Sequence, residues 1–239
     1  MQPSATDAGD MTVMLRLSGG DAVSLRLLRE RCALVPSASA LLLADTHLGK
    51  SAAMRAKGVP VPSGPGRACL ERLEAVADRV RPARVIVLGD LLHAPTGVTD
   101  ELHRLVRSAT DRLGAMGARV ELVPGNHDRK LGQAGLERLC GELGIVLRPP
   151  EVRLEDAPGL VLVHDAADAP GAAFAIGGHL HPAAVLRGGG DAVRLPAALL
   201  GARRLVLPAF GSFVSGVRSQ PEAGERLLAF GPRGVFDAQ

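Results

Sequence analysis

The segment VELVPGNHD (residues 120–128) changes character halfway along, from strand-like residues to polar ones. Its first half is an apolar-leaning run typical of a buried strand, which Pro124 and Gly125 end abruptly. Asn126, His127 and Asp128 then follow without a break. An amide, an imidazole and a carboxylate are groups that bind metal ions and transfer protons. The segment therefore predicts a functional site where this strand ends.

Four other apolar runs end in the same way: LLLADTH (41–47), VIVLGD (85–90), LVLVHD (160–165) and AFAIGGHLH (173–181). Apolar residues recur with helical spacing in the segments 67–80, 99–116 and 131–143, and Thr99 is a suitable N-cap. Strands that alternate with helices in this manner predict an α/β fold with buried parallel strands.

Both ends of the chain are predicted to be rich in β-structure. Residues 11–35 alternate around a turn at 18–21, which predicts a hairpin followed by a short strand at 32–35. The helical pattern stops after residue 144, and short strands are expected at 145–147, 151–155, 160–164, 173–177, 184–187, 191–195, 203–207 and 226–230. No change of composition divides the chain. We therefore expect a flexible tail over 1–10 and a single domain over 11–239.

Composition limits the class of protein. The chain has 239 residues, of which 46% are hydrophobic, but no run reaches the roughly 18 apolar residues of a membrane helix. The first ten residues lack the features of a signal peptide, and the three cysteines form no CxxC motif, so we expect a cytoplasmic protein without a disulfide framework. The net charge is only +3, and Trp and Tyr are absent, which argues against an aromatic platform for single-stranded nucleic acid. Any DNA would be bound mainly through its phosphates.

The polar residues at the five run ends form a candidate metal-binding set: Asp45, His47, Asp90, Asn126, His164, His179 and His181. In open α/β sheets, ligands bind beyond the carboxyl ends of the strands, so these ends should converge. Imidazole, carboxylate and amide donors without a thiolate suit Mn²⁺, Fe or Zn²⁺ better than Ca²⁺. Seven candidates are too many for one ion and fit two ions, roughly 3.5–4 Å apart, that share a carboxylate. Asp90, which follows Gly89, is our candidate for that bridge.

In chain order, the motifs resemble those of the calcineurin-like metallophosphoesterases: DTH (45–47), GD (89–90), GNHD (125–128), a lone His164 and GHLH (178–181). The resemblance implies a four-layer α/β/β/α sandwich with two packed β-sheets. It also implies a phosphodiesterase that uses two divalent metal ions, most often Mn²⁺, and hydrolyses phosphate esters by attack of metal-bound hydroxide.

A narrower resemblance covers most of the chain. The chain is similar to the bacterial ligase-associated metallophosphoesterases, described as DNA damage response endonucleases, in the segments 44–64, 89–93, 125–129, 177–183 and 207–213. This similarity implies action on DNA ends in repair and a functional association with an ATP-dependent DNA ligase and a ligase-associated helicase. The chain departs from that family at Ala197 and Ala198, where a Cys-Phe pair is expected.

The family pattern also implies a role for each site residue. It assigns to one ion Asp45, His47, Asp90 and His181, and to the other Asp90, Asn126, His164 and His179. His127 would face the substrate and donate a proton to the leaving oxygen. Asp128 would hydrogen-bond His127 and keep it oriented.

Three further residues are candidates for binding substrate phosphates. Lys50 and Arg129 each follow a ligand motif closely, although an ordinary solvated basic surface is the alternative interpretation. His93 is a candidate for contact with the substrate or a metal-bound water, or is a hydrogen-bonded loop histidine.

Two other functions remain open at this stage. A phosphodiesterase of small molecules or cyclic nucleotides would need the same metals, and the modest charge and missing aromatic platform are compatible with it. A non-catalytic scaffold that binds a protein is the other alternative, and the complete set of ligand positions argues against it. The sequence makes no prediction about the oligomeric state.

Overall fold

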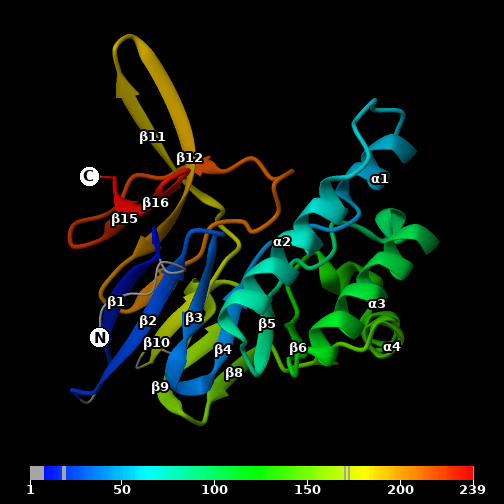
Figure 1. The fold of residues 1–239 in the computed structure, drawn as a ribbon, viewed down its shortest axis with the longest axis horizontal. Coiled ribbons are helices and arrows are strands. Elements are labelled where there is room, and N and C mark those ends of the chain that lie inside the picture. The colour runs from blue at the N-terminus through cyan, green and yellow to red at the C-terminus, as the bar shows by residue number, and fades with distance from the viewer. Residues whose placement is uncertain (1–7, 18–19, 170, 172, 239) are drawn as a thin grey trace.

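The computed structural model describes residues 8–17, 20–169, 171 and 173–238, and it has a mixed α/β fold with two sheets (Figure 1). Residues 1–7 of the expected flexible tail lie outside the described residues. The end of that segment is bound to the domain, because the Asp10 carboxylate accepts hydrogen bonds from Arg26 and Arg79 and the Gly9 carbonyl accepts one from Val235.

The first sheet contains seven strands that lie side by side in chain order: β1 (Met11–Arg16), β2 (Ala22–Leu28), β3 (Cys32–Val35), β4 (Ala40–Leu43), β5 (Arg84–Leu88), β6 (Arg119–Val123) and β7 (Val146–Leu147). β1 to β4 form an antiparallel meander, which confirms the predicted hairpin and the strand after it. β4 to β7 are parallel. Their carboxyl ends therefore lie at one edge of the sheet.

Helices α2 (Pro65–Val80), α3 (Asp100–Ala115) and α4 (Gln133–Leu143) cover one face of this sheet, whereas the short α1 (Lys50–Ala56) packs beside α2. The stripes of α2, α3 and α4 pack on the sheet, and the Thr99 side chain accepts a hydrogen bond from the Leu102 N–H, as its prediction as an N-cap requires. The short helix α1 was not predicted. Its sequence, KSAAMRA, offers only Ala53 as a fully buried residue, so it lacks an apolar stripe.

The second sheet contains nine strands: β8 (Glu151–Leu154), β9 (Ala157–Val163), β10 (Phe174–Gly177), β11 (Pro182–Gly188), β12 (Asp191–Leu200), β13 (Arg204–Val206), β14 (Val217–Arg218), β15 (Arg226–Gly231) and β16 (Gly234–Asp237). β9, β10 and β13 are parallel to one another. β14 and β16 were not predicted, and β12 continues five residues beyond its expected end because Pro196 to Leu200 pair with β13, β11 and β15.

The core consists of two layers, because side chains of the first sheet alternate between its faces. In β4, Leu41 and Leu43 pack against the helices, whereas Leu42 packs against the second sheet. The α/β class and the two packed sheets are as expected. The outer helical layer over the second sheet is reduced in the described residues to the 3₁₀ turn Ala166–Asp168, since the link from β9 to β10 is short.

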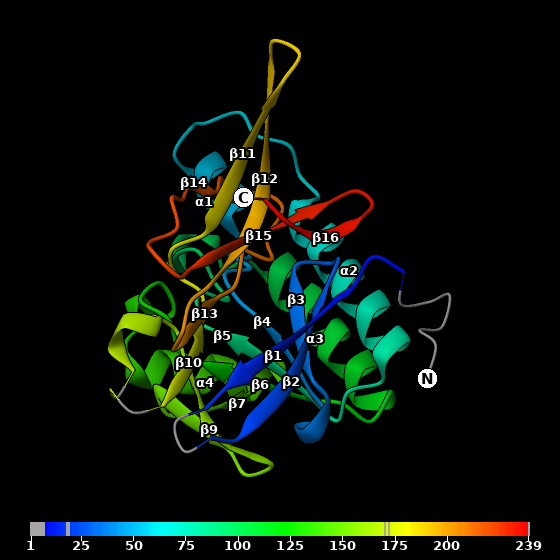
Figure 2. The same cartoon turned by 90° about the vertical axis from the view of Figure 1, so that its left-hand side faces the viewer.

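Two parts of the fold project from the body. The hairpin of β11 and β12 extends well beyond the second sheet, and α1 with the loop after it projects on the other side (Figures 1 and 2). Among the described residues, no helix is long and apolar enough to cross a membrane.

Candidate metal centre

The five predicted strand ends meet at one place in the structure. Asp45 and His47 follow β4, Asp90 follows β5, and Asn126 and His127 follow β6. The other candidates lie on the second sheet, where they follow the parallel strands β9 and β10: His164, His179 and His181. Since both sheets present the carboxyl ends of parallel strands here, the seven side chains face one another across the edge where the sheets pack.

One group of side chains surrounds His47. Its Nε2 atom lies 3.3 Å from Nε2 of His181 and 3.8 Å from Oδ2 of Asp90. Nε2 of His181 is also 3.2 Å from Oδ1 of Asp45. Four donor atoms from three strand ends therefore converge on one small volume.

A second group surrounds His164. Its Nε2 atom lies 3.0 Å from Oδ1 of Asn126 and 3.1 Å from Nδ1 of His179. The same Nε2 is 3.5 Å from Oδ1 of Asp90, whereas Oδ2 of Asp90 is the oxygen that faces His47. The two carboxylate oxygens of Asp90 thus point to different groups, which is the arrangement that a bridging ligand needs.

The chemistry of these atoms fits bound cations. Oδ1 of Asp45 and Nδ1 of His47 are buried and have no hydrogen-bond partner among the described residues. Burial, together with the neighbouring imidazoles of His181 and His127, lowers the pKa of His47 to about 2. A neutral imidazole is the form that ligates metals, and a metal ion among the converging donors would satisfy the orphan oxygen of Asp45.

Two glycines allow the ligands to approach this closely. A Cβ atom on Gly178 would lie 2.3 Å from Oδ2 of Asp45, and one on Gly125 would lie 2.3 Å from Oδ1 of Asp90. Both distances are far below van der Waals contact, so a larger residue at either position would displace a carboxylate. This explains why the GNHD and GHLH motifs each begin with glycine.

The backbone at the site is strained as well. Eight non-glycine residues in the described part of the chain have positive φ, and five of them are predicted ligands: Asp45 (55°), His47 (45°), Asp90 (50°), His179 (70°) and His181 (47°). Positive φ costs free energy for residues with a Cβ, and such strain is concentrated at functional sites. The fold therefore maintains unfavourable conformations where the side chains converge.

His127 lies at the rim of the group around His47. Its backbone N–H donates to Oδ1 of Asp90 at 2.8 Å, and its Nε2 atom is 3.9 Å from Oδ2 of the same carboxylate. Nδ1 is 2.5 Å from the carbonyl oxygen of His93, on whose ring His127 stacks. Because a carbonyl oxygen only accepts, Nδ1 carries the proton in this contact, and Nε2 is turned toward the centre.

The structure gives Asp128 different partners from those expected, so the predicted bond from its carboxylate to His127 is wrong. The buried carboxylate accepts hydrogen bonds from the backbone N–H groups of Leu92 and Gly125, each at 2.9 Å. Burial raises its pKa to about 6. Asp128 therefore joins the loop after β5 to the loop after β6, and the His93 carbonyl takes the orienting role. Sequence spacing gives no signal for a backbone partner of this kind.

The basic candidates differ in their placement. Lys50 is partly buried, which lowers its pKa, and its Nζ atom is 5.8 Å from the centre of the Phe213 ring. Arg129 is exposed. The next residue, Lys130, places Nζ 3.3 Å from Nδ1 of His127. Lys130 is thus a neighbour of the site as well, because its spacing of three from His127 fits the 3₁₀ turn Asp128–Leu131.

His93 lies beside the candidate metal centre. Its ring lies 5.5 Å from that of His47 and 5.2 Å from that of His127. Burial and the charge of Lys50 lower its pKa to about 4, so the ring is neutral near pH 7. It therefore borders the site as an uncharged group.

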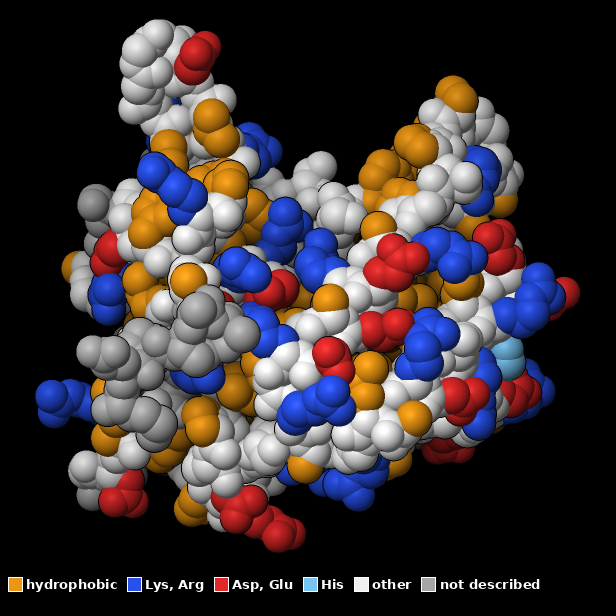
Figure 3. Space-filling model, in the orientation of Figure 1, with side chains coloured by type: hydrophobic (Ala, Val, Ile, Leu, Met, Phe, Trp, Pro, Cys, Tyr) orange, Lys and Arg blue, Asp and Glu red, His pale blue; other side chains and the backbone are white. Residues whose placement is uncertain are grey.

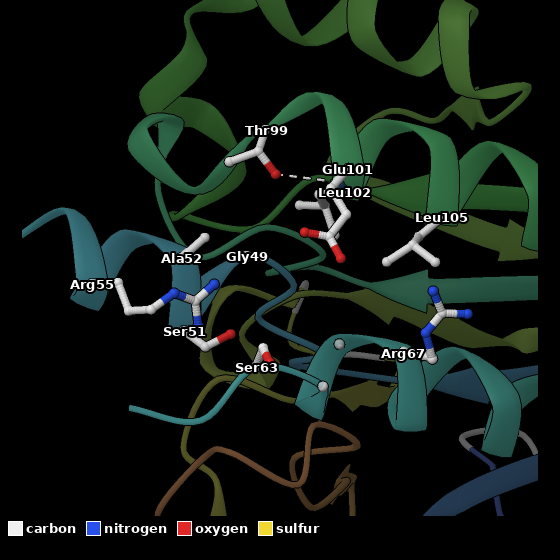
Figure 4. Close-up of a pocket in the computed structure, with 12 residues that line it drawn as sticks. Gly49, Ser51, Ala52, Arg55, Ser63, Arg67, Thr99, Glu101, Leu102 and Leu105 are labelled. Atoms are coloured by element: carbon white, nitrogen blue, oxygen red, sulfur yellow. Dashed lines mark hydrogen bonds between the residues drawn. The ribbon is translucent and has the colours of Figure 1, made fainter. Parts of the chain in front are cut away.

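One pocket of about 170 Å³ lies between α1, the start of α2 and the start of α3 (Figure 4). Arg67 and Glu101 extend toward it from α2 and α3. None of the seven candidate ligands lines it.

Comparisons with known proteins agree with this geometry. Residues 39–164 match the family model described as calcineurin-like phosphoesterase. The crystal structure of a nuclease named MPE from Pseudomonas putida superposes with a TM-score of 0.74 and 30% sequence identity, over 95% of this chain and 100% of that one. A protein of unknown function from Aquifex aeolicus, AQ665, gives a TM-score of 0.39 and 18% identity over 59% of this chain and 78% of its own. No curated protein matched the chain.

Proposed function

The chain belongs to the calcineurin-like phosphoesterase family and is a metal-dependent hydrolase, and from this premise we propose that it is a dinuclear phosphodiesterase acting on DNA. The observation that carries the proposal is the pair of donor groups on either side of Asp90. Each group contains imidazole and carboxylate donors, and the two carboxylate oxygens of Asp90 face one group each.

Two divalent ions, once bound, would neutralise phosphate charge and lower the pKa of a water molecule. Asp45, His47 and His181 would hold one ion, Asn126, His164 and His179 the other, and Asp90 both. We propose Mn²⁺, with Fe or Zn²⁺ as alternatives, because the donors are nitrogen and oxygen without sulfur.

His127 is proposed to protonate the leaving oxygen. Its Nδ1 proton is directed to the His93 carbonyl, so Nε2 is the atom that would face the substrate. Donation from Nε2 requires the imidazolium form, in which both ring nitrogens carry a proton, and leaves the neutral ring protonated on Nδ1. The orientation of the imidazole is fixed by the stacked His93 ring and by the hydrogen bond from the His127 backbone N–H to Asp90. Proton donation is most important where the leaving group is a poor one, such as a sugar hydroxyl.

Nucleic acid is the proposed substrate class. The nuclease from Pseudomonas putida shares the fold over nearly the whole chain at 30% identity. Figure 3 shows an open hollow between the β11–β12 hairpin and α1, with Lys and Arg side chains along its floor. An open basic hollow suits a polymer. We further propose a role at DNA ends in repair, in functional association with an ATP-dependent ligase and a ligase-associated helicase, as the similarity in sequence implies.

A phosphodiesterase of small molecules is the second candidate. The same metal centre would serve it, but a small ester is generally enclosed by its site, and the hollow here is open. A non-catalytic scaffold is disfavoured, because all seven donors and His127 are present and oriented.

The test is a substrate panel with purified protein loaded with Mn²⁺, Fe²⁺ or Zn²⁺. The panel contains bis-p-nitrophenyl phosphate, 2′,3′-cyclic nucleotides, and single-stranded, nicked and 3′-blocked DNA. We expect cleavage of DNA with a kcat/KM well above that for cyclic nucleotides. A preference for cyclic nucleotides would support the second candidate, and hydrolysis of no substrate with any metal would support the scaffold.

A further inference from the structure

A second pocket, of about 250 Å³, opens directly beside the metal centre at the base of the β11–β12 hairpin. It is lined by His181, one of the candidate ligands, and by two arginines, Arg31 and Arg194. None of the described residues that line it is acidic. A ligand in this pocket would therefore adjoin the metal centre and meet only positive charge.

Arg31 has the properties of an unsatisfied cation. It lies at the turn between β2 and β3 with a φ of 71°, and no ion pair of its guanidinium is present among the described residues. Burial and the nearby charge of Arg72 lower its pKa. Arg72 stacks on the Phe210 ring and donates to the Phe210 carbonyl. Both of these partners are neutral, so they do not offset the repulsion between the two guanidinium groups. An anion in the pocket would offset this repulsion.

Arg194 approaches the pocket from β12. Its Nη1 atom donates to the Gly216 carbonyl at 3.2 Å, which holds the side chain between the hairpin and the loop 211–216. A guanidinium has five N–H donors and binds phosphate oxygens in pairs. One donor is used in this contact, so the side chain is positioned and still has donors for an anion.

The loop 211–216 connects this pocket to the other side of the centre. Ser212 borders the Arg31–Arg194 pocket and also a narrow recess that contains His47, Lys50 and Phe213. The two metal-proximal recesses thus lie along one loop, with a candidate ligand in each. A chain of phosphates could contact both recesses, whereas an ester with one phosphate could not.

We propose that the Arg31–Arg194 pocket binds a phosphate of a nucleic-acid strand that neighbours the phosphate being cleaved. The inference rests on the proposed function and deepens it, because it makes the substrate a polymer and names the residues that recognise it. The two arginines bind substrate and play no part in the chemistry at the metals.

The experiment compares the Mn²⁺-loaded wild type with the Arg31→Gln/Arg194→Gln double variant on two substrates. We expect kcat/KM on a single-stranded oligonucleotide to fall about tenfold or more, and kcat/KM on bis-p-nitrophenyl phosphate, which has one phosphate, to stay within twofold. For single strands, each lost phosphate contact should also reduce the slope of log affinity against log salt by about 0.7. Arg104→Gln/Arg138→Gln, a pair of exposed changes on α3 and α4, is the control of equal charge.

An equal loss on both substrates would overturn the inference, because it would indicate damage to the metal centre. An unchanged kcat/KM on the oligonucleotide would overturn it as well. Arg194→Gln alone, at an exposed position, is the second variant if the double variant folds poorly. Binding of a fluorescent phosphorothioate oligonucleotide separates the two proposals: weaker binding by the variant supports the pocket even if the wild type cleaves no DNA, whereas equal binding refutes it.

Discussion

Replacing Gly178 by alanine should displace a metal ligand without removing any donor. The added Cβ would lie 2.3 Å from Oδ2 of Asp45, whereas ordinary contact begins at 3.4 Å, so the carboxylate must move by about 1 Å. Metal–ligand distances tolerate only about 0.2 Å. A misplacement of about 1 Å typically costs a factor of about 100 in rate. We therefore expect G178A to lose affinity for one ion and about 100-fold in kcat/KM on bis-p-nitrophenyl phosphate.

Elemental analysis after equilibration with Mn²⁺ and a titration of activity against Mn²⁺ measure these effects. Gly114→Ala and Gly141→Ala are matched controls, because a Cβ at either helical position meets nothing within 4 Å. Their metal content should be that of the wild type. The new Cβ of G178A would also lie 2.4 Å from Cβ of Ala44, so the double variant A44G/G178A removes that clash but keeps the one with Asp45. Full activity in A44G/G178A, or two metal equivalents with wild-type rate in G178A, would refute the reasoning.

Three further predictions concern the site and the core. Asp90→Ala should retain fewer than two metal equivalents, and Mn²⁺ should raise its Tm less than it raises that of the wild type; equal shifts would contradict the bridging role. His127→Ala should keep both ions and lose about 10²- to 10⁴-fold in rate on DNA but much less on p-nitrophenyl esters, so similar losses on the two would exclude a role in leaving-group protonation. Glu121 is buried and pairs with Arg84 at 2.7 Å; burial opposes its ionisation, but the arginines outweigh burial and lower its pKa. Glu121→Gln should therefore cost about 1.5–3 kcal/mol in urea unfolding at pH 7. Because the folded pKa is the lower one, this difference should shrink as the pH falls below about 4.3, and a constant difference would argue against the ion pair.

Sequence reasoning predicted the parts of the fold whose pattern depends on burial. The stripes of α2 and α3 repeat with helical spacing because one face of each helix packs on the first sheet. The helix α1 was missed, since it buries little, and β14 and β16 were missed because two- and four-residue edge strands carry no clear alternation. The end of β12 was misplaced for another reason. Pairing with β15 extends β12, and this partner strand is distant in sequence.

At the site, residue types were easier to predict than contacts. The seven donors could be named because each follows an apolar run, and parallel strands bring such ends together. Contacts with the backbone could not be named. The orientation of His127 by the His93 carbonyl and the binding of Asp128 to the N–H groups of Leu92 and Gly125 depend on loop paths, which residue spacing does not encode.

The donors come from both sheets, and this has a consequence for the order of folding. Asp45 follows a strand of the first sheet and His181 a strand of the second, more than half the chain later. Neither sheet alone assembles a complete set, so ions should bind only after the two have docked. Once bound, the ions would link the two sheets, because each ion would have ligands from both. Removing them should accelerate hydrogen exchange in β4–β6 and β9–β10 together, rather than in one sheet first.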